Sequence, residues 1–281
     1  MSELMTNQGH YYETPIPKGQ LNARQITVVK IGGSTHEERA EIVGDIAFLG
    51  RVCHERIVIV HGGGKEIDKA LEEAGVITEK VDGVRVTPHK VLEEIVAPVL
   101  EKINREIRTI LLEHRVATCG FLPEHGLLRS EIENPKLGFV GGMPDIEQSE
   151  LNLLQKYVLG GAVPVVCPIA IQKDNPSQRL NVNADLSAGA LAAFMGSKLV
   201  LLTDKPGVLD ENGETIKRIN LSDYENSEQR GMISGGMLPK IKACVPVVQR
   251  GGFAVICNDI WEAFHLDPRG TVIKKEPQYE S

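Results

Sequence analysis

The chain has 281 residues, a formal net charge of −7 and 42% hydrophobic residues, which is the composition of an ordinary globular protein. The negative charge excludes a chain-wide attraction to nucleic acid or to an anionic membrane, so neither is expected as a partner. The longest nearly uncharged apolar stretch, Leu159–Ile171, is too short and too interrupted by proline for a transmembrane helix. The 5 cysteines form no CxxC pair and no secretory signal pattern is present, so we expect a cytoplasmic location.

Two apolar strands, each followed by glycines and then by a helix, open the predicted fold. Residues 1–25 are polar, and we expect them to form an extension ahead of the first core element. The run Ile26–Ile31 predicts a strand, and Thr35–Glu38 has the capping-box spacing of a helix N-terminus. A second such strand is expected in Arg56–Gly64. Continuous rather than alternating apolar runs are typical of parallel strands that are covered on both faces, so the sequence predicts an α/β fold.

The middle of the chain predicts two hairpins and a long helix. An Asp-Gly pair between short β-like runs indicates a hairpin in Glu79–Thr87, and Leu127–Gly142 is interpreted as a second one. A helix is expected from about residue 88 to residue 114, with a kink at Pro98.

The second half of the chain continues the alternation of helices and strands. Residues 172–180 are polar and contain a proline, so we place the boundary there, between an N-terminal lobe of residues 26–172 and a C-terminal lobe of residues 173–281. The expected elements are a small-residue helix, a strand, a helix after a glycine turn and an edge strand, at Asn181–Gly196, Lys198–Asp204, Gly235–Gly252 and Arg269–Ile273.

Two glycine clusters follow the first two predicted strands, GGS at residues 32–34 and HGGG at residues 61–64. The P-loop pattern and the dinucleotide-binding pattern are both absent from the sequence. Each cluster alone can be a tight turn. Helix N-termini, however, present unpaired N–H groups and partial positive charge, and glycine allows an anion to approach them. Two such clusters at adjacent strand ends therefore predict one anion-binding crevice.

The order of six motifs resembles the amino acid kinase family from about Ile26 to Ile273; the motifs are KIGGS, HGGG, GVRVT, NVNAD, LLTDKPGVLD and GGMLPK. The resemblance implies an αβα sandwich with a mostly parallel central sheet, in which the N-terminal lobe binds the acceptor and the C-terminal lobe binds ATP. The pattern is nearest to members that phosphorylate N-acetyl-L-glutamate. The implied reaction is ATP-dependent phosphorylation of its side-chain carboxylate to N-acetylglutamyl 5-phosphate, in arginine biosynthesis, with Mg²⁺ held mainly by the nucleotide phosphates.

The resemblance also implies the catalytic residues. Lys30 and Lys240 match the two family lysines that stabilise the transferring phosphoryl group, and Asp185 matches the aspartate that orients them. A carboxylate acceptor is already ionised at neutral pH, so this chemistry needs positive charge and N–H donors rather than a general base. The phosphate-binding residues implied in the two glycine clusters are Gly32, Gly33, Gly63 and Gly64.

The remaining matches lie on the acceptor and nucleotide sides. Arg85 matches the arginine that binds the substrate α-carboxylate, for which a guanidinium fork is better suited than an ammonium group. Asn181 and the Gly63 backbone match further acceptor contacts. Thr203, Asp204 and Gly207 match residues that contact the nucleotide. Read alone, a hairpin arginine can equally be a solvated charge, and a strand-end aspartate or a turn glycine has ordinary structural uses.

Three alternatives stay open at this point. The acceptor could be aminoadipate or glutamate tethered to an acidic carrier protein, although the segment 129–136 carries balanced rather than basic charges. It could be another small acid. The chain could also be a non-catalytic nucleotide- or oxoanion-binding protein of the same fold, for which loss of the lysines would be the mark. The resemblance implies that an N-terminal helix builds hexamers in some members of the family. Gly9, Pro15 and Pro17 disfavour such a helix here, so a homodimer is expected.

Overall fold

The structure is a computed structural model that describes residues 26–32, 36–77, 79–81, 83–221, 237–265 and 267–275. The predicted N-terminal extension and Gly33 lie outside these residues. Within them, no helix is both long enough and apolar enough to cross a membrane.

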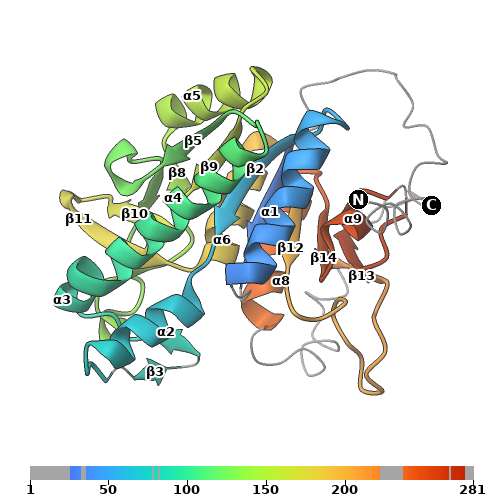
Figure 1. Cartoon of the computed structure of the whole chain (residues 1–281). Coiled ribbons are helices and arrows are strands. Elements are labelled where there is room, and N and C mark those ends of the chain that lie inside the picture. Colours follow the sequence, from blue (N-terminus) through green and yellow to red (C-terminus); the bar gives the residue numbers. More distant parts are fainter. Residues whose placement is uncertain are drawn as a thin grey trace.

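The described part of the chain is built around an eight-stranded sheet (Figure 1). Neighbouring strands are parallel except for β14 and β15, which pair antiparallel, so the predicted α/β class with a mostly parallel sheet is confirmed. In spatial order the strands are β13 (Arg218–Asn220), β15 (Thr271–Lys274), β14 (Ala254–Cys257), β12 (Lys198–Leu202), β1 (Ile26–Ile31), β2 (Arg56–His61), β9 (Val163–Val166) and β5 (Thr118–Phe121).

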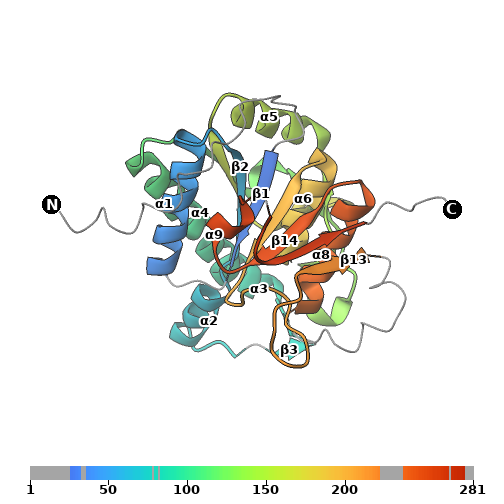
Figure 2. The same ribbon diagram turned by 90° about the vertical axis from the view of Figure 1, so that its right-hand side faces the viewer.

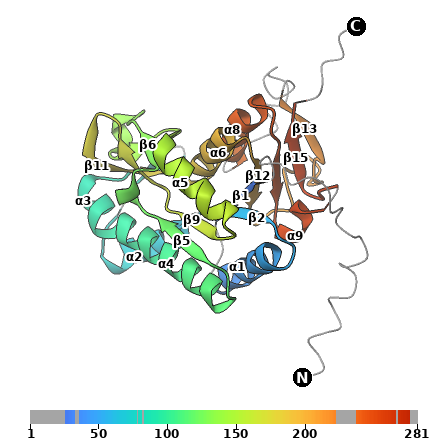
Figure 3. The ribbon, with the colours of Figure 1, turned by 90° about the horizontal axis from the view of Figure 1, so that it is seen from above.

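Helices cover both faces of this sheet, as Figure 3 shows from above. The continuous apolar strands require this arrangement, because side chains on both faces of β1 are buried. Val28 and Val60 belong to the core on one face, whereas Val29 and Ile59 belong to the core on the other. The first face is covered by α5 (Gln148–Leu159), α6 (Ala184–Met195) and α8 (Met237–Gln249), and the second by α1 (His36–Arg51), α4 (Ala97–Glu113) and α9 (Ile260–Ala263).

The predicted long helix between residues 88 and 114 is present but is not uniform. It begins as α3 (His89–Val91), widens into a π-helical turn at Leu92–Val96 and continues as α4. Pro98 stands in the first turn of α4 and has no N–H to donate to the preceding turn. A π-turn directly before a proline accommodates this missing donor, so the irregularity lies just ahead of the residue predicted to kink the helix.

A second, five-stranded sheet and a small hairpin flank the central sheet on the side of β9 and β5. The hairpin of β3 (Lys80–Val81) and β4 (Val84–Arg85) is confirmed. The order of the second sheet is β7 (Val140–Gly141), β11 (Asn175–Val182), β10 (Ile169–Gln172), β6 (Leu128–Ser130) and β8 (Asp145–Ile146). The arms of the hairpin predicted over Leu127–Gly142 meet only at an antiparallel bridge between Ile132 and Gly141, where the Gly142 N–H donates to the Glu131 carbonyl at 3.1 Å. Beyond this bridge, β11 and β10 lie between β7 and β6 in the sheet, so the prediction is correct only at the turn end.

Two further expectations concern the second half of the chain. The strand predicted near residue 271 exists as β15 but does not lie at an edge, since β13 pairs with its outer side. The expected lobe boundary between residues 172 and 173 falls in the turn that joins β10 to β11, and these strands pair with each other. The division into two lobes therefore stays a prediction.

The carboxyl ends of β1 and β2 lead to the two glycine clusters that were predicted to bind an anion. Residues Lys30 and Ile31 of β1 are in register with Val60 and His61 of β2, so Gly32 and the HGGG turn follow the two strands at the same end of the sheet. Helix α2 (Gly64–Glu73) starts from the second turn. Figure 2 shows α2, α3 and the β3 hairpin gathered at one end of the molecule.

Candidate active site

Three charged side chains from three different elements meet beside the end of β1. The Nζ atom of Lys30 lies 2.9 Å from Oδ1 of Asp185, and the Nζ atom of Lys240 lies 2.9 Å from Oδ2 of the same carboxylate. The side chains of Lys30, Asp185 and Lys240 are 9%, 7% and 13% exposed. One carboxylate thus forms ion pairs with two ammonium groups that are almost fully buried. The three side chains together carry a net positive charge.

Burial and charge act against each other in this triad. Burial lowers the pKa of the Lys30 ammonium below its usual value, while the nearby Asp185 carboxylate opposes that shift. Burial alone would raise the pKa of Asp185, but the two lysine charges outweigh it and hold that pKa below its usual value. Asp185 is therefore a carboxylate at neutral pH. A cluster of this kind is suited to binding a polyanion with several negative oxygens.

The position of Asp185 is set by the N-terminus of α6, because Asp185 is in the first turn of this helix. Asn183 is the N-cap residue, and its side chain accepts hydrogen bonds from the N–H groups of Asp185 at 2.7 Å and Leu186 at 3.4 Å. Two residues of the NVNAD motif thus have different structural roles. Asn183 caps the helix, and Asp185 in its first turn contacts the lysines.

Lys240 reaches Asp185 because α6 and α8 approach very closely. Gly189 lies one turn after Asp185, and Ala243 lies one turn after Lys240. A Cβ atom on Gly189 would lie 2.2 Å from the backbone oxygen of Ala243, which is far inside normal contact distance. The small residues of α6 therefore set the helix spacing at which the Lys240 ammonium meets the carboxylate.

We expect Gly189→Ala to separate the two helices and weaken the triad. The variant should lose about 1–3 kcal/mol of unfolding free energy, the range for overpacking a close contact. Because a misplacement of about 1 Å can cost about 100-fold in rate, we expect kcat to fall by about tenfold with KM little changed. Urea unfolding and steady-state kinetics measure both effects. Gly50→Ala in α1 is the matched control, since its Cβ would meet Val163 at an ordinary 3.6 Å.

The described glycines of the two turns lie close to the triad or to the core. A Cβ atom on Gly32 would lie 1.9 Å from the Lys30 ammonium nitrogen, so the observed position of the lysine side chain requires glycine at residue 32. The N–H of Gly62 donates to the Ile31 carbonyl at 2.7 Å, which ties the HGGG turn to the end of β1. Gly63 is the N-cap of α2, and its Cβ would lie 2.8 Å from Leu100 and Ile103 of α4. At Gly64 the same position is open.

The structure connects the two predicted acceptor residues, Arg85 and Asn181, through Thr87. The Thr87 hydroxyl donates to the backbone oxygen of Arg85 at 3.1 Å, and the Asn181 amide donates to the Thr87 hydroxyl at 3.3 Å. Arg85 also donates to Asp68 on α2 at 2.5 Å. Burial alone would raise the pKa of Asp68, but its hydrogen bond and ion pair with Arg85 lower that pKa below its usual value. The guanidinium is thus held in place by the helix that starts at the HGGG turn.

The residues predicted to contact the nucleotide, Thr203, Asp204 and Gly207, follow the carboxyl end of β12. This strand is the neighbour of β1 in the sheet. The N–H of Thr203 donates to the Cys257 carbonyl at 3.0 Å, and its hydroxyl donates to Asp204 at 3.1 Å. Gly207 packs tightly, since its Cβ would lie 2.5 Å from the Thr271 hydroxyl. These contacts place the three residues at the same end of the sheet as Lys30, where the parallel strands have their carboxyl ends. Gly207 also has a clear packing role.

Two residues of this region were not predicted from the sequence as site residues. Thr87 is fully buried yet polar, and Asp68 pairs with the guanidinium expected to bind substrate. Each residue has one signal in the sequence. Thr87 is the last residue of the GVRVT motif, and Asp68 lies four residues after the last glycine of the HGGG cluster, one helical turn into the helix that follows.

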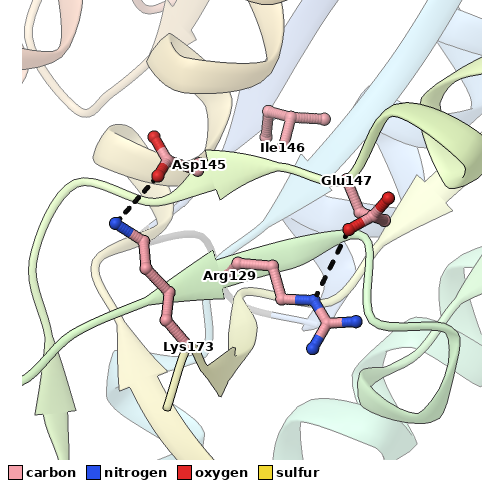
Figure 4. Close-up of a pocket in the computed structure, with 5 residues that line it drawn as sticks. All are labelled: Arg129, Asp145, Ile146, Glu147 and Lys173. Carbon is pink, nitrogen blue, oxygen red and sulfur yellow. Dashed lines mark ion pairs between the residues drawn. The ribbon is translucent and has the colours of Figure 1, made fainter. Parts of the chain in front are cut away.

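A separate pocket of about 340 Å³ lies on the second sheet, over the paired strands β6 and β8 and beside Lys173 (Figure 4). Its charged lining is paired: Lys173 contacts Asp145 at 2.8 Å and Glu131 at 3.0 Å, and Arg129 lies 4.0 Å from Glu147. The cations of this region are therefore offset by neighbouring carboxylates. This observation gives no support to a basic docking surface for an acidic carrier protein.

Comparisons with known proteins agree with the geometry. The sequence pattern of the amino acid kinase family matches residues 25–258. An acetylglutamate kinase from Campylobacter hominis is 36% identical over 235 residues, which covers 81% of this chain and 80% of that protein. An acetylglutamate kinase from Campylobacter curvus is 35% identical over 273 residues, covering 92% of this chain and 95% of that protein.

Solved structures share the fold at lower sequence identity. A carbamate kinase from Giardia lamblia bound to AMP-PNP has a TM-score of 0.63 and 16% identity, covering 90% of this chain and 99% of the other. This likeness supports the arrangement of sheet and helices.

Proposed function

The chain belongs to the amino acid kinase family, and from this premise we propose that it phosphorylates the side-chain carboxylate of N-acetyl-L-glutamate with ATP. The products are N-acetylglutamyl 5-phosphate and ADP, and the reaction belongs to arginine biosynthesis. The curated relatives named acetylglutamate kinase support this assignment over most of the chain. The observation that carries it is the buried triad in which Asp185 holds Lys30 and Lys240 side by side.

The triad suits phosphoryl transfer to a carboxylate. The acceptor is an anion and so is the triphosphate, so the barrier comes largely from repulsion between negative oxygens. Lys30 and Lys240 place positive charge where negative charge develops, and Asp185 prevents the two ammonium groups from moving apart. No residue has to remove a proton from an ionised carboxylate. The low exposure of the three side chains strengthens these electrostatic interactions.

The glycine turns supply N–H donors in this proposal. Gly32 lets the phosphoryl group approach Lys30, and the N–H groups of Gly33, Gly63 and Gly64 bind its oxygens. Helix α2 begins at Gly64, so its positive N-terminal end faces the same anion.

ATP binding is assigned to the C-terminal part of the site, with Thr203, Asp204 and Gly207 as contacts. The excess positive charge of the triad fits a triphosphate. Mg²⁺ is held mainly by the phosphates, the usual mode for this ion, and supplies additional neutralisation of their charge. We place the enzyme in the cytoplasm. We also propose that it is a homodimer, and light scattering of the purified chain would measure its mass in solution.

Arg85 is assigned to the α-carboxylate of the acceptor and Asn181 to the same substrate. We expect Arg85→Lys to raise KM for N-acetyl-L-glutamate by about tenfold, because an ammonium group loses one of the two charge-assisted hydrogen bonds of the guanidinium. The value of kcat should change much less, since the contact is the same in ground and transition states.

Steady-state kinetics with varied acceptor would measure this change. Arg218→Lys on β13, where the side chain is 64% exposed, is the control. An unchanged acceptor KM in Arg85→Lys would remove this arginine from the carboxylate site.

The proposed function is tested by a hydroxamate assay with Mg-ATP, because hydroxylamine traps acyl phosphates. The acceptors compared are N-acetyl-L-glutamate, L-glutamate, L-aspartate and α-aminoadipate. A strong signal with N-acetyl-L-glutamate alone is the expected result. The absence of signal with all of them, with ADP still raising Tm, would overturn this acceptor in favour of a carrier-bound acid, a non-carboxylate acceptor or a storage role.

A further inference from the structure

A buried histidine stands directly before the glycines of the HGGG turn and has no role in the chemistry proposed so far. His61, the last residue of β2, is 1% exposed. It follows Ile57 and Ile59 in the alternation of the strand, so its side chain belongs to the face covered by α1 and α4. Lys30 lies on the opposite face, beside Asp185 of α6. Burial lowers the pKa of His61 to about 4, so the ring is neutral at physiological pH.

The neighbours of the ring fix which of its nitrogens carries the proton. Nδ1 lies 3.0 Å from the carbonyl oxygen of Gly62, and a carbonyl can only accept, so Nδ1 is the donor. Nε2 is then an acceptor, and the Asn104 side-chain nitrogen lies 3.4 Å from it. The same Asn104 nitrogen donates to the Val165 carbonyl at 3.0 Å, which anchors it to β9. Asn104 of α4 therefore holds the ring in the tautomer that binds Gly62.

This contact determines how the peptide between Gly62 and Gly63 is turned. In a planar trans peptide the N–H points opposite to the C=O. The Gly62 carbonyl points toward the ring on the α4 face, so the Gly63 N–H points toward the face of Lys30 and Asp185. Glycine has the largest range of allowed backbone conformations, so a Gly-Gly peptide without a hydrogen-bond partner can rotate at little cost in free energy. A rotated peptide would present a carbonyl oxygen to the anion and repel it.

From these contacts we infer that His61 and Asn104 are positioning residues, which hold the Gly62–Gly63 peptide with its N–H directed at the transferring phosphoryl group. The inference rests on the proposed function for the identity of that anion. The N–H of Gly62 donates to the Ile31 carbonyl at 2.7 Å, so both backbone polar groups of Gly62 have a hydrogen-bond partner. Neither His61 nor Asn104 touches substrate in this scheme; both act through the glycine backbone.

The test compares two substitutions of one residue. His61→Asn places an amide nitrogen where Nδ1 stood and keeps the donor to Gly62, whereas His61→Leu removes the donor and fills the buried position with an apolar side chain. With Mg-ATP and N-acetyl-L-glutamate, His61→Leu should lower kcat by at least about tenfold and leave acceptor KM within about threefold, while His61→Asn stays within about threefold in both. Asn104→Leu should lower kcat in the same direction.

Crystal structures of the wild type and of His61→Leu provide a readout that does not depend on turnover. The expected result is a rotated Gly62–Gly63 peptide in His61→Leu and an unchanged one in His61→Asn. An unrotated peptide in His61→Leu would overturn the inference, and so would equal losses of kcat in both variants. A wild-type enzyme that phosphorylates none of the acceptors, with the peptide still rotated only in His61→Leu, would refute the proposed reaction and retain the positioning role.

Discussion

Lys240→Ala should lower kcat by at least about 100-fold, the scale for removing one preorganised charge contact to a transition state. The ammonium lies 2.9 Å from Asp185 and is 13% exposed, so its charge acts at short range and with little screening. The fold should remain intact, because Asp185 keeps Lys30 as a partner. Lys30→Ala should produce a loss of similar size.

The matched control for this experiment is Lys242→Ala, which removes an exposed lysine two residues further along α8. Circular dichroism and Tm report on folding, and steady-state kinetics report on activity. A Lys240→Ala enzyme within about threefold of wild-type kcat would exclude that lysine from phosphoryl transfer, whatever its contact with Asp185.

Asp185→Asn should impair both stability and activity. The amide has no charge, so two ammonium groups are left close together and the buried Lys30 loses its counter-ion. Breaking a buried ion pair by removing one partner costs about 3–5 kcal/mol, and we expect a decrease of this order in the free energy of unfolding. We also expect kcat to fall by at least about 100-fold, because the lysines are no longer held at the anion site.

The pH dependence of this variant provides a second measurement. The pKa of Asp185 is lower in the folded protein than its usual value of 3.8, so its contribution to stability is fully present above that value and is lost as pH falls from it through the lower folded-state pKa. The difference in urea midpoint between wild type and Asp185→Asn should therefore shrink below about pH 4. Asp174→Asn, in the exposed turn after β10, is the control. A difference that is constant with pH would contradict the charged state assigned to Asp185.

Much of the fold could be predicted from local patterns. Continuous apolar runs such as Ile26–Ile31 indicate a parallel strand buried on both faces, because each side chain then needs an apolar neighbour. The strand at Thr271–Lys274 was predicted as an edge strand, which is wrong, and the hairpin predicted over Leu127–Gly142 is present only as one antiparallel bridge between Ile132 and Gly141. Both differences have one reason: the partner of a strand depends on which distant strand offers a free edge, and periodicity carries no information on that.

The candidate residues were also found by motif, but their arrangement was not. Lys30, Asp185 and Lys240 were assigned by the resemblance of KIGGS, NVNAD and GGMLPK to one family. The two contacts at 2.9 Å depend on the close approach of α6 to α8 at Gly189, more than 40 residues before α8. Nothing in the local sequence of Gly189 distinguishes a packing glycine from any other small residue of the helix.

The sequence by itself determined the α/β class, the order of the elements, the family and the chemical types at the site, because these follow from local composition and from motif order. Only the tertiary structure decided which charges share a carboxylate, that Asp68 holds Arg85, and that the neutral ring of His61 faces the Gly62 carbonyl. The physical reason is range. Propensity and periodicity act over neighbouring residues, whereas burial, ion pairing and peptide orientation depend on atoms that the fold brings together from distant parts of the chain.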